Sequence, residues 1–157
     1  MYDLILISPI NTQLGRFKRF VPRSVPIGVG ILAGFLRKQG LSVKIIDQEL
    51  VDINISTIED ILKQCKNPRI IGISVMTANV ASGYKTASII KSVDKDAIVV
   101  FGGIHPTVMP DEILQNGNID FIVKGEAEYT FLELIRQIKG GSIERDKLEN
   151  IGFVEDG

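Results

Sequence analysis

The stretch Arg69-Ile70-Ile71-Gly72-Ile73-Ser74 decides the fold class of this chain. It is followed by a helical pattern over residues 79–93 and then by a second apolar run, Ala97-Ile98-Val99-Val100-Phe101. Short apolar runs of this kind are typical of strands that are buried on both faces of a parallel sheet. The stretch 69–101 therefore predicts a β–α–β unit, in which a helix joins two parallel strands.

The same alternation continues toward both ends of the chain. Further apolar runs predict strands at residues 3–7, 43–46 and 120–123. Helical spacing and capping signals predict helices at residues 26–39, 56–65, 111–115 and 127–139. The pattern indicates an α/β fold with a doubly wound, five-stranded parallel sheet and three α/β/α layers. The expected strand order is 2-1-3-4-5, which is the flavodoxin-like (Rossmann-like) order.

Local signals place several helix ends. Pro26 suits the first turn of its helix, and Gly40 suits the C-terminal cap. Ser56 is the expected N-cap of the second helix, because Glu59 follows at the spacing of a capping box. Asn79 is the expected N-cap of the third.

Length and composition predict one globular domain over residues 1–139. The chain has 157 residues, of which 45% are hydrophobic and 24% charged, and a core of this size needs no disulfides. Residues 140–157 are Gly/Ser-rich and then charged. They are expected to form a C-terminal tail or linker, or an extra strand at 151–154, and not a second domain.

Composition also excludes several classes of protein. The single cysteine, Cys65, cannot form an internal disulfide, and zinc or iron–sulfur sites need several ligands. A reducing, cytoplasmic setting is therefore expected. No apolar run approaches the ~18–20 residues that span a bilayer, and the N-terminus lacks a secretory signal pattern. The formal net charge of -1 argues against a nucleic-acid-binding protein.

Basic residues gather in the long segment between the first strand and the first helix. Arg16, Lys18, Arg19 and Arg23 stand in a stretch that contains no acid. This stretch is either a solvated loop or a surface that meets an anionic ligand or an acidic partner.

Ligands of such sheets bind beyond the carboxyl ends of the strands, so the loops there supply the candidate residues. Ser74 and Thr77 bring hydroxyl groups to the end of the third strand, where they either bind a ligand or cap local backbone. The pair Gly102-Gly103 allows a close approach of the backbone, or simply a tight turn. His105 is the only histidine, and it is either a ligand or acid–base group or a residue that hydrogen-bonds within its loop.

Glycines and carboxylates mark two helix starts. Glu126 and Glu128 stand where the last helix begins, and the helix dipole alone would favour them there. The first helix contains Gly28, Gly30 and Gly34, each of which costs up to ~1 kcal/mol relative to alanine. Such a cost suggests that a strand or a flat ligand approaches this helix closely.

Several familiar motifs are missing. The first strand is not followed by G-x-G-x-x-G, and neither a P-loop nor a G-x-S-x-G nucleophile elbow is present. A phosphoacceptor receiver domain would need acidic residues after the first strand and an aspartate after the third. The chain has Ser8-Pro9 and Ser74-Val75 at these places, which argues against that class.

Five stretches, in order and at the strand ends, carry a resemblance to a known family. They are Pro26–Ala33, Val43–Asp47, Gly72–Thr77, Phe101–Thr107 and Asp120–Glu128. Together they resemble the N-terminal cobalamin (B12)-binding domain of cobalamin-dependent radical SAM enzymes, a group that includes the anaerobic magnesium-protoporphyrin monomethyl ester cyclases. The resemblance covers nearly the whole chain.

The resemblance implies a cobalamin on the carboxyl edge of the sheet, with its nucleotide tail running down between strands and helices. Ser74 and Thr77 would line the tail cavity, and Gly102-Gly103 would let the tail pass close to the backbone. The loop around His105, with Gly125-Glu126, would lie at the corrin rim. The cofactor-binding residues implied in this way are Ser8, Pro9, Asn11, Thr12, Pro26, Gly28, Gly30, Ser74, Met76, Thr77, Gly102, Gly103, His105, Pro106, Gly125 and Glu126.

The chain departs from better-known cobalamin modules after its first strand. Those modules carry D-x-H-x-x-G, whose histidine ligates cobalt from below. If Gly15 is taken as the glycine, Ile10 and Thr12 stand at the aspartate and histidine positions, and neither can replace its counterpart. A base-off corrinoid without a histidine ligand from this motif is therefore expected.

A second departure concerns the radical SAM reaction itself. That reaction needs a [4Fe–4S] cluster held by C-x-x-x-C-x-x-C, and the chain contains only Cys65. Cluster and S-adenosylmethionine would belong to a domain that this chain lacks, toward which residues 140–157 would lead. The chain is implied to be a module that presents cobalt to chemistry elsewhere, and not a catalyst by itself.

Two other functions stay open from the sequence. The same fold could serve as a docking or regulatory module without a ligand, with the stretch Arg16–Arg23 meeting an acidic partner. The chain could also be a small independent enzyme that uses His105 with Glu126 or Glu128 as acid–base groups, if these side chains converge.

Overall fold

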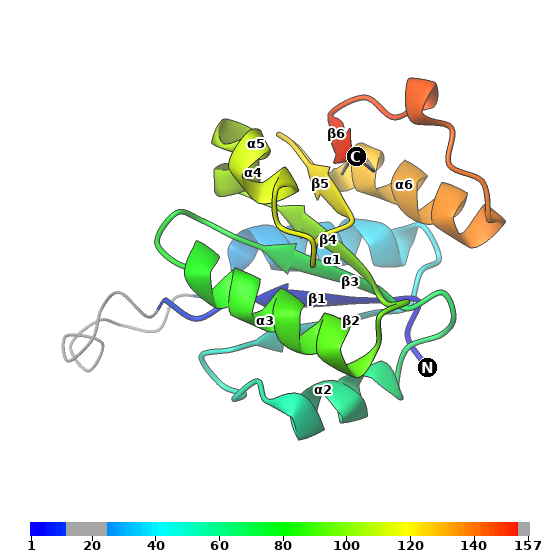
Figure 1. Ribbon diagram of the computed structural model, residues 1–157. Coiled ribbons are helices and arrows are strands. Elements are labelled where there is room, and N and C mark those ends of the chain that lie inside the picture. The colour runs from blue at the N-terminus through cyan, green and yellow to red at the C-terminus, as the bar shows by residue number, and fades with distance from the viewer. Residues whose placement is uncertain (12–24, 154–157) are drawn as a thin grey trace.

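A computed structural model describes residues 1–11 and 25–153, which form a six-stranded sheet between two layers of helices (Figure 1). The strand order is β2-β1-β3-β4-β5-β6. The strands are β1 (Leu4–Ser8), β2 (Val43–Asp47), β3 (Ile70–Ser74), β4 (Ile98–Gly102), β5 (Phe121–Val123) and β6 (Ile151–Phe153). The first five are parallel, which confirms the predicted fold class and the order 2-1-3-4-5.

The predicted count of five strands is wrong, because β6 pairs with β5 in the antiparallel direction. Of the alternatives for the end of the chain, the extra strand is therefore observed for residues 151–153. Leu148 and Ile151 are both buried against the sheet, so this segment adds to the core. The boundary after residue 139 stays a prediction.

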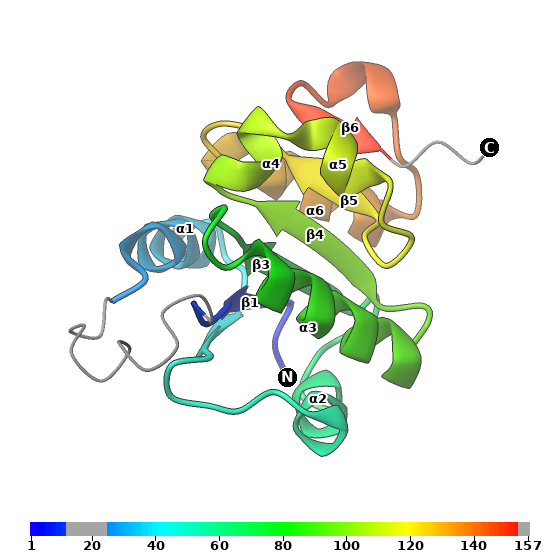
Figure 2. The same ribbon diagram turned by 60° about the vertical axis from the view of Figure 1, so that its left-hand side comes forward.

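The helices cover the two faces of the sheet as separate layers (Figure 2). One face carries α1 (Ile27–Lys38) and α6 (Glu128–Gly140), which share a core with Leu6, Val100 and Val123. The other face carries α2 (Ile55–Leu62), α3 (Val80–Val93) and α5 (Pro110–Leu114), which pack on Ile7, Ile73 and Phe101. Because alternate strand residues point to opposite faces, the continuous apolar runs fill both cores.

Two local expectations are corrected. The N-cap of α2 is Asn54, whose Oδ1 accepts a hydrogen bond from the Thr57 N–H at 3.0 Å, so Ser56 and Glu59 form no capping box. Residues 102–115 hold two short helices, α4 (Ile104–Val108) and α5, where the sequence predicted only one at 111–115. His105 therefore lies on a helix and not in a loop. A short 3₁₀ turn, η2 (Arg145–Lys147), precedes β6.

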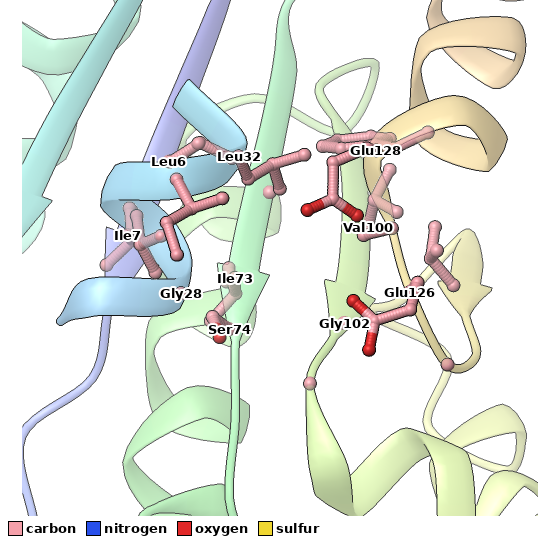
Figure 3. Close-up of a pocket in the computed structure, with 18 residues that line it drawn as sticks. Leu6, Ile7, Gly28, Leu32, Ile73, Ser74, Val100, Gly102, Glu126 and Glu128 are labelled. Carbon is pink, nitrogen blue, oxygen red and sulfur yellow. The ribbon is translucent and has the colours of Figure 1, made fainter. Parts of the chain in front are cut away.

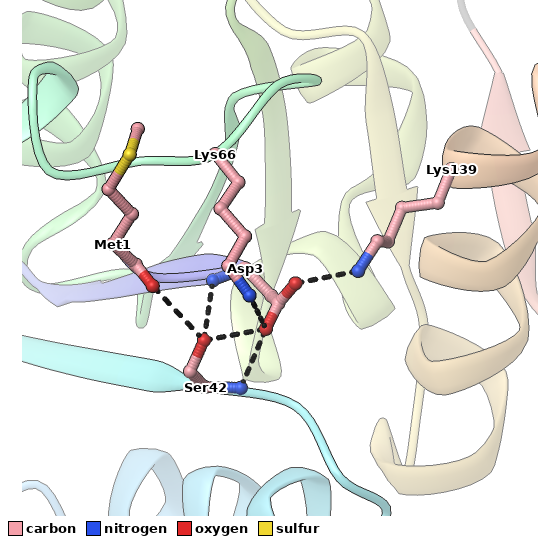
Figure 4. Close-up of polar contacts among 5 residues, drawn as sticks. All are labelled: Met1, Asp3, Ser42, Lys66 and Lys139. Atoms are coloured by element: carbon pink, nitrogen blue, oxygen red, sulfur yellow. Dashed lines mark hydrogen bonds and ion pairs between the residues drawn. The ribbon is translucent and has the colours of Figure 1, made fainter.

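The amino ends of the strands meet around the buried carboxylate of Asp3 (Figure 4). Its Oδ1 accepts from Lys139 Nζ at 2.6 Å, and its Oδ2 accepts from Ser42 Oγ at 2.6 Å and Lys66 Nζ at 3.1 Å. Burial alone would raise the pKa of this carboxyl, but the hydrogen bonds from Lys139, Ser42 and Lys66 outweigh it and hold the pKa well below its usual range. Asp3 thus ties β1 to the segments before β2 and β3 and to the end of α6.

None of the helices in residues 1–11 and 25–153 is long and apolar enough to cross a membrane.

Candidate ligand-binding site

A pocket of about 220 Å³ opens at the carboxyl edge of the sheet, between α1 and α6 (Figure 3). The ends of β1, β3, β4 and β5 form its floor, and the loop from β5 into α6 forms one wall. The pocket is lined by Leu6, Ile7, Gly28, Val29, Ile31, Leu32, Gly72, Ile73, Ser74, Val100, Gly102, Gly103, Val123, Gly125, Glu126, Ala127, Glu128 and Phe131. It lies at the edge where ligands of doubly wound sheets bind.

The floor of the pocket is apolar. A Cβ atom on Gly72 would lie 2.7 Å from Leu6 Cδ2 and 3.2 Å from the Phe131 ring. Glycine at this point of β3 therefore lets Leu6 and Phe131 close over the strand, where they are 4% and 3% exposed. The result is an apolar floor of closely packed side chains.

The mouth of the pocket is polar. Glu126 from the β5–α6 loop and Glu128 from the first turn of α6 direct their carboxylates into it, and the Ser74 hydroxyl lies at the end of β3 (Figure 3). Within the described part of the chain, these three side chains have no hydrogen-bond or ion-pair partner. A ligand that presents hydrogen-bond donors at this mouth would satisfy them.

The glycines of α1 border open space. A Cβ atom added to Gly28, Gly30 or Gly34 would meet no atom within 4 Å. The predicted close approach of a strand is therefore not the reason for these glycines. Gly28 lines the pocket, whereas Gly30 and Gly34 do not.

The backbone conformation at residue 103 requires a glycine. Its φ is +104°, and a Cβ atom would lie 2.6 Å from the Val75 carbonyl oxygen. This loop is held by hydrogen bonds from the Val75 N–H to Gly102 O at 2.8 Å and from the His105 N–H to Val75 O at 3.3 Å. The tight-turn interpretation of Gly102-Gly103 thus applies to Gly103, while both residues also line the pocket.

His105 is buried at 3% exposure and does not line the pocket. Its Nδ1 lies 3.1 Å from Thr77 Oγ1, and its Nε2 lies 3.5 Å from Glu112 Oε1 on α5. Among the described residues, no hydrogen bond or ion pair joins His105 to Glu126 or Glu128. The convergence that an acid–base enzyme would need is thus not observed, while the position of the His105 loop at a corrin rim stays a prediction.

Two buried amides fix the chain where it leaves β1, and neither was a predicted site residue. Asn79 donates from Nδ2 to Pro9 O at 3.0 Å, and its Oδ1 accepts from the Met76 N–H at 2.7 Å. It holds the N-cap position of α3, but its side chain does not cap that helix as predicted. Gln48 accepts from the Ile10 N–H at 3.0 Å through Oε1 and donates to Thr86 Oγ1 at 2.7 Å. A polar residue directly after β2 was the only sequence signal for Gln48.

The structure brings together six of the sixteen predicted cofactor-binding residues in the pocket lining. These are Gly28, Ser74, Gly102, Gly103, Gly125 and Glu126. Nine more lie near the edge without lining the pocket: Ser8, Pro9, Asn11, Pro26, Gly30, Met76, Thr77, His105 and Pro106. Thr12 lies outside the described residues, as does the basic stretch Arg16–Arg23. The assignment of these residues to a cofactor stays a prediction.

Sequence reasoning missed most of the pocket lining, because it looked for polar residues and glycines in loops. The lining residues that were not predicted to bind the cofactor are Leu6, Ile7, Val29, Ile31, Leu32, Gly72, Ile73, Val100, Val123, Ala127, Glu128 and Phe131, of which Glu128 had been considered only as an acid–base group. Most of them are the strand and helix residues whose apolar character predicted the fold.

Exposed apolar side chains surround the pocket at the carboxyl edge. On α1 and just before it, Val25, Ile27 and Ile31 are 75%, 69% and 59% exposed. Others follow β3, form α4 or begin α6, namely Met76, Ile104, Val108, Met109 and Tyr129. Groups of exposed apolar residues of this kind are typical of binding surfaces.

The thiol of Cys65 lacks the exposure and the low pKa of a reactive cysteine. It is buried, and burial raises its pKa to about 11. Residues 1–11 and 25–153 contain no group of three or more His, Cys, Asp or Glu residues placed to hold a metal ion.

A family model described as the B12 binding domain matches residues 14–135. This chain belongs to that family. The match takes in most of the pocket lining, from Gly28 to Phe131. The recognition made from the five sequence stretches is thereby confirmed at the level of the family.

Curated relatives of this B12-binding domain are longer proteins. The chain is 34% identical over 143 residues to the uncharacterized methyltransferase PH0819 of Pyrococcus horikoshii, covering 90% of this chain and 30% of that protein. It is 32% identical over 124 residues to the anaerobic magnesium-protoporphyrin IX monomethyl ester cyclase of Rubrivivax gelatinosus. This match covers 78% of this chain and 22% of the cyclase. The chain therefore spans less than a third of the length of either relative.

A solved structure shares the fold. It is the radical S-adenosylmethionine methyltransferase TsrM from Kitasatospora setae, with cobalamin and a [4Fe-4S] cluster bound. The TM-score is 0.78 at 21% identity, with 99% of this chain and 28% of TsrM covered. The domain thus has the fold seen in one part of a cobalamin-bound radical enzyme.

Proposed function

We propose that this B12-binding domain binds cobalamin at the carboxyl edge of its sheet and presents the cobalt to a radical SAM domain. The observation that carries the proposal is the pocket between α1 and α6, which lies within the residues that match the B12-binding family. The second half is supported by the relatives, a methyltransferase and a cyclase that each contain a region similar to this chain. It is also supported by TsrM, a radical S-adenosylmethionine methyltransferase with cobalamin and a [4Fe-4S] cluster bound.

The shape of the pocket suits one end of cobalamin better than the whole molecule. Pockets that enclose a drug-sized ligand measure ~300–1,000 Å³, and this one measures about 220 Å³. The apolar floor of Leu6 and Phe131 suits the planar base of the nucleotide tail. The ribose hydroxyl groups would then donate to the carboxylates of Glu126 and Glu128 at the mouth.

The corrin ring would lie outside the pocket, over the exposed apolar residues of the carboxyl edge. Ile27 and Ile31 of α1 stand on one side of the mouth, and Ile104 of α4 is 63% exposed beyond β4. Covering these side chains would remove apolar surface from water, which stabilises the complex by roughly 25 cal/mol per Å².

The cobalt is proposed to receive no histidine ligand from this domain. His105 is the only histidine of the chain, and its ring is buried against Thr77 and Glu112. Residues Ile10 and Thr12 replace the ligating motif of other modules. We therefore infer a base-off corrinoid whose lower face has water, no ligand, or another residue of this chain.

The remaining chemistry is assigned to another domain. With Cys65 buried and alone, this chain cannot supply the cysteines that a [4Fe-4S] cluster requires. Bound cobalamin would supply a cobalt centre for group transfer, and this domain's residues would hold and orient it. We propose that cluster and S-adenosylmethionine bind in a partner domain that faces the exposed apolar residues.

Titration of the purified domain with cobalamin tests the proposal. We expect stoichiometric uptake, and we expect Gly28→Phe to abolish it, because Gly28 lines the pocket and its added Cβ would meet no atom within 4 Å, so the ring is free to occupy the ligand's space. Gly34→Phe is the matched control on the same helix, since its Cβ would also meet no atom within 4 Å and Gly34 does not line the pocket. Equal uptake by both variants would contradict the pocket assignment.

Electron spin resonance of the bound cobalt tests the absence of a histidine ligand. The reduced cobalt centre is expected to show no splitting from a protein nitrogen. Labelling His105, the one histidine, with ¹⁵N should leave the spectrum unchanged. A splitting that responds to this label would disprove the proposed coordination.

A further inference from the structure

A series of polar contacts runs from Tyr84 on α3, through Glu112 and His105, to the carboxyl edge. The Tyr84 hydroxyl donates to Glu112 Oε1 at 3.0 Å, and the same oxygen lies 3.5 Å from His105 Nε2. On the other side of the ring, His105 Nδ1 lies 3.1 Å from Thr77 Oγ1. Thr77 is exposed in the loop that follows β3. The series of polar contacts therefore reaches the edge where the ligand is proposed to bind.

The contacts determine which ring nitrogen carries the proton. Nε2 is buried and makes no hydrogen bond among the described residues, and Glu112 Oε1 is the acidic oxygen that faces it. Glu112 acts as an acceptor there, because it already receives the hydroxyl of Tyr84, whose pKa is raised to about 12 by burial and by this carboxylate. A lone pair on Nε2 would be repelled by the same oxygen, whereas an N–H would be attracted. In the neutral ring, these contacts favour the tautomer with the proton on Nε2.

This tautomer leaves Nδ1 as an acceptor, so the Thr77 hydroxyl must be the donor of the 3.1 Å contact. The hydrogen of that hydroxyl then points inward, toward α4. The oxygen lone pairs remain on the exposed side of Thr77. An alcohol fixed in this way can accept a hydrogen bond from a ligand but cannot donate one.

The helix that carries His105, α4, is hydrogen-bonded to the loops on both sides of it. The His105 N–H donates to Val75 O at 3.3 Å. Thr107 Oγ1 donates to Gly103 O at 2.9 Å and accepts from the Gly125 N–H at 2.9 Å. Because α4 is bonded to the loops after β3 and β5, the ring of His105 is fixed before any ligand arrives, which lowers the entropy lost on binding.

We propose that His105 is a positioning residue, which turns the Thr77 hydroxyl so that Thr77 accepts a hydrogen bond from the ligand. The inference rests on the proposed function, and the carboxamide N–H groups of cobalamin are donors of the required kind. Sequence reasoning placed His105 itself at the corrin rim, whereas here it acts only through Thr77.

Nuclear magnetic resonance of ¹⁵N-histidine-labelled, ligand-free domain tests the tautomer directly. The chain contains one histidine, so a single pair of ring nitrogens is observed. We expect the neutral ring to carry its proton on Nε2 and to leave Nδ1 unprotonated. A proton on Nδ1 would overturn the inference, and this result needs neither cobalamin nor any variant.

Cobalamin titration of Thr77 variants tests the contact itself. Thr77→Val should weaken binding about 5- to 10-fold, the loss expected for one hydrogen bond, while Thr77→Ser should stay near the wild type. Thr57→Val, a matched change on α2 outside the pocket lining, should have no effect on binding.

His105→Leu shows whether the effect passes through Thr77. It should weaken binding to the same extent as Thr77→Val, and the double variant should be no weaker than either single variant. Full affinity of Thr77→Val, or additive losses in the double variant, would overturn the inference. If the wild-type domain takes up no cobalamin, the proposed function fails, whereas a wrong tautomer in a domain that binds cobalamin refutes only the role of His105.

Discussion

The carboxylates at the two edges of the sheet differ in burial and in hydrogen-bond partners. At the amino edge, Asp3 is 6% exposed and receives hydrogen bonds from Ser42 and from two lysines (Figure 4). At the carboxyl edge, Glu126 and Glu128 direct their carboxylates into a pocket, without a partner in the described residues (Figure 3). Both edges are made by the same strands.

The difference separates groups that hold the fold together from groups that are available to a ligand. A buried carboxylate is tolerated only when hydrogen bonds replace the lost water, which is the situation of Asp3. Carboxylates without partners at an open mouth keep their water until something displaces it. We therefore expect changes at the amino edge to alter stability and changes at the carboxyl edge to alter binding.

The largest expected effect is at the amino edge. Asp3→Asn should lower the free energy of unfolding by about 2–3 kcal/mol, because the charge-assisted bonds from Lys66 and Lys139 are lost while these partly exposed lysines still reach water. Urea unfolding measures this change. Asp60→Asn, which breaks only the exposed pair with Lys63, is the control and should leave the midpoint unchanged.

Cobalamin affinity of Asp3→Asn completes that test. The affinity should equal that of the wild type, since Asp3 lies at the edge opposite the pocket. A tenfold loss of affinity with intact folding would break the proposed separation of the two edges.

The second prediction concerns pH and the same carboxylate. The pKa of Asp3 is lower in the folded chain than in the unfolded chain, so folding favours the ionised form. Its contribution is complete above the unfolded pKa and is lost as the pH falls, between about pH 5 and pH 3 and below. The stability difference between the wild type and Asp3→Asn should shrink over this range. A difference that stays constant with pH would contradict the assignment.

The third prediction concerns Asn79, a buried polar residue at the carboxyl edge, which should affect both stability and binding. Asn79→Ala removes the bonds to Pro9 O and the Met76 N–H, and it should lower the free energy of unfolding by about 1–2 kcal/mol. Because these bonds fix two loops beside the pocket, cobalamin binding should weaken as well. Asn118→Ala is the control, since its side chain bonds only within its own turn after α5. An effect on stability alone would show that the loops are placed by other contacts.

The smallest effect is expected at the pocket mouth. Replacing both Glu126 and Glu128 by Gln should weaken cobalamin binding several-fold, because an amide accepts hydrogen bonds less strongly than a carboxylate. The urea midpoint should hardly change, apart from a few tenths of a kcal/mol that Glu128 contributes at the start of α6. Glu59→Gln with Asp60→Asn on α2 supplies a matched control at a distance from the pocket. Unchanged affinity in the pocket variant would remove the two carboxylates from the site.

Strand positions and order were predictable from sequence, because residues 4–7 and 70–73 form apolar runs that only a doubly covered sheet can bury. β6 was harder to predict, since Ile-Gly-Phe is too short to show a period and becomes a strand only by pairing with β5. The cap of α2 shows the same limit. Ser56 and Asn54 are both good caps, and the direction in which the chain enters the helix decides between them.

The pocket was predictable in its place and not in its composition. The rule for parallel sheets gives the carboxyl edge, and glycines such as Gly28 and Gly102 mark parts of it. The floor depends on which side chains of neighbouring strands and helices meet, and Leu6 and Phe131, which both lie over Gly72, are far apart in sequence. The burial of His105 has the same cause, because its partners Thr77 and Glu112 come from other segments.

Leu6 and Phe131 belong both to the hydrophobic core and to the pocket lining, so a ligand bound there would stabilise the fold. Both belong to the core beneath α1 and α6, and both form the pocket floor. A ligand seated on them extends the core, and it binds the folded chain only. By thermodynamic linkage, free cobalamin at a hundredfold excess over its Kd would raise the free energy of unfolding by ~2.7 kcal/mol. The loaded domain would therefore also be the one that better resists heat and proteolysis.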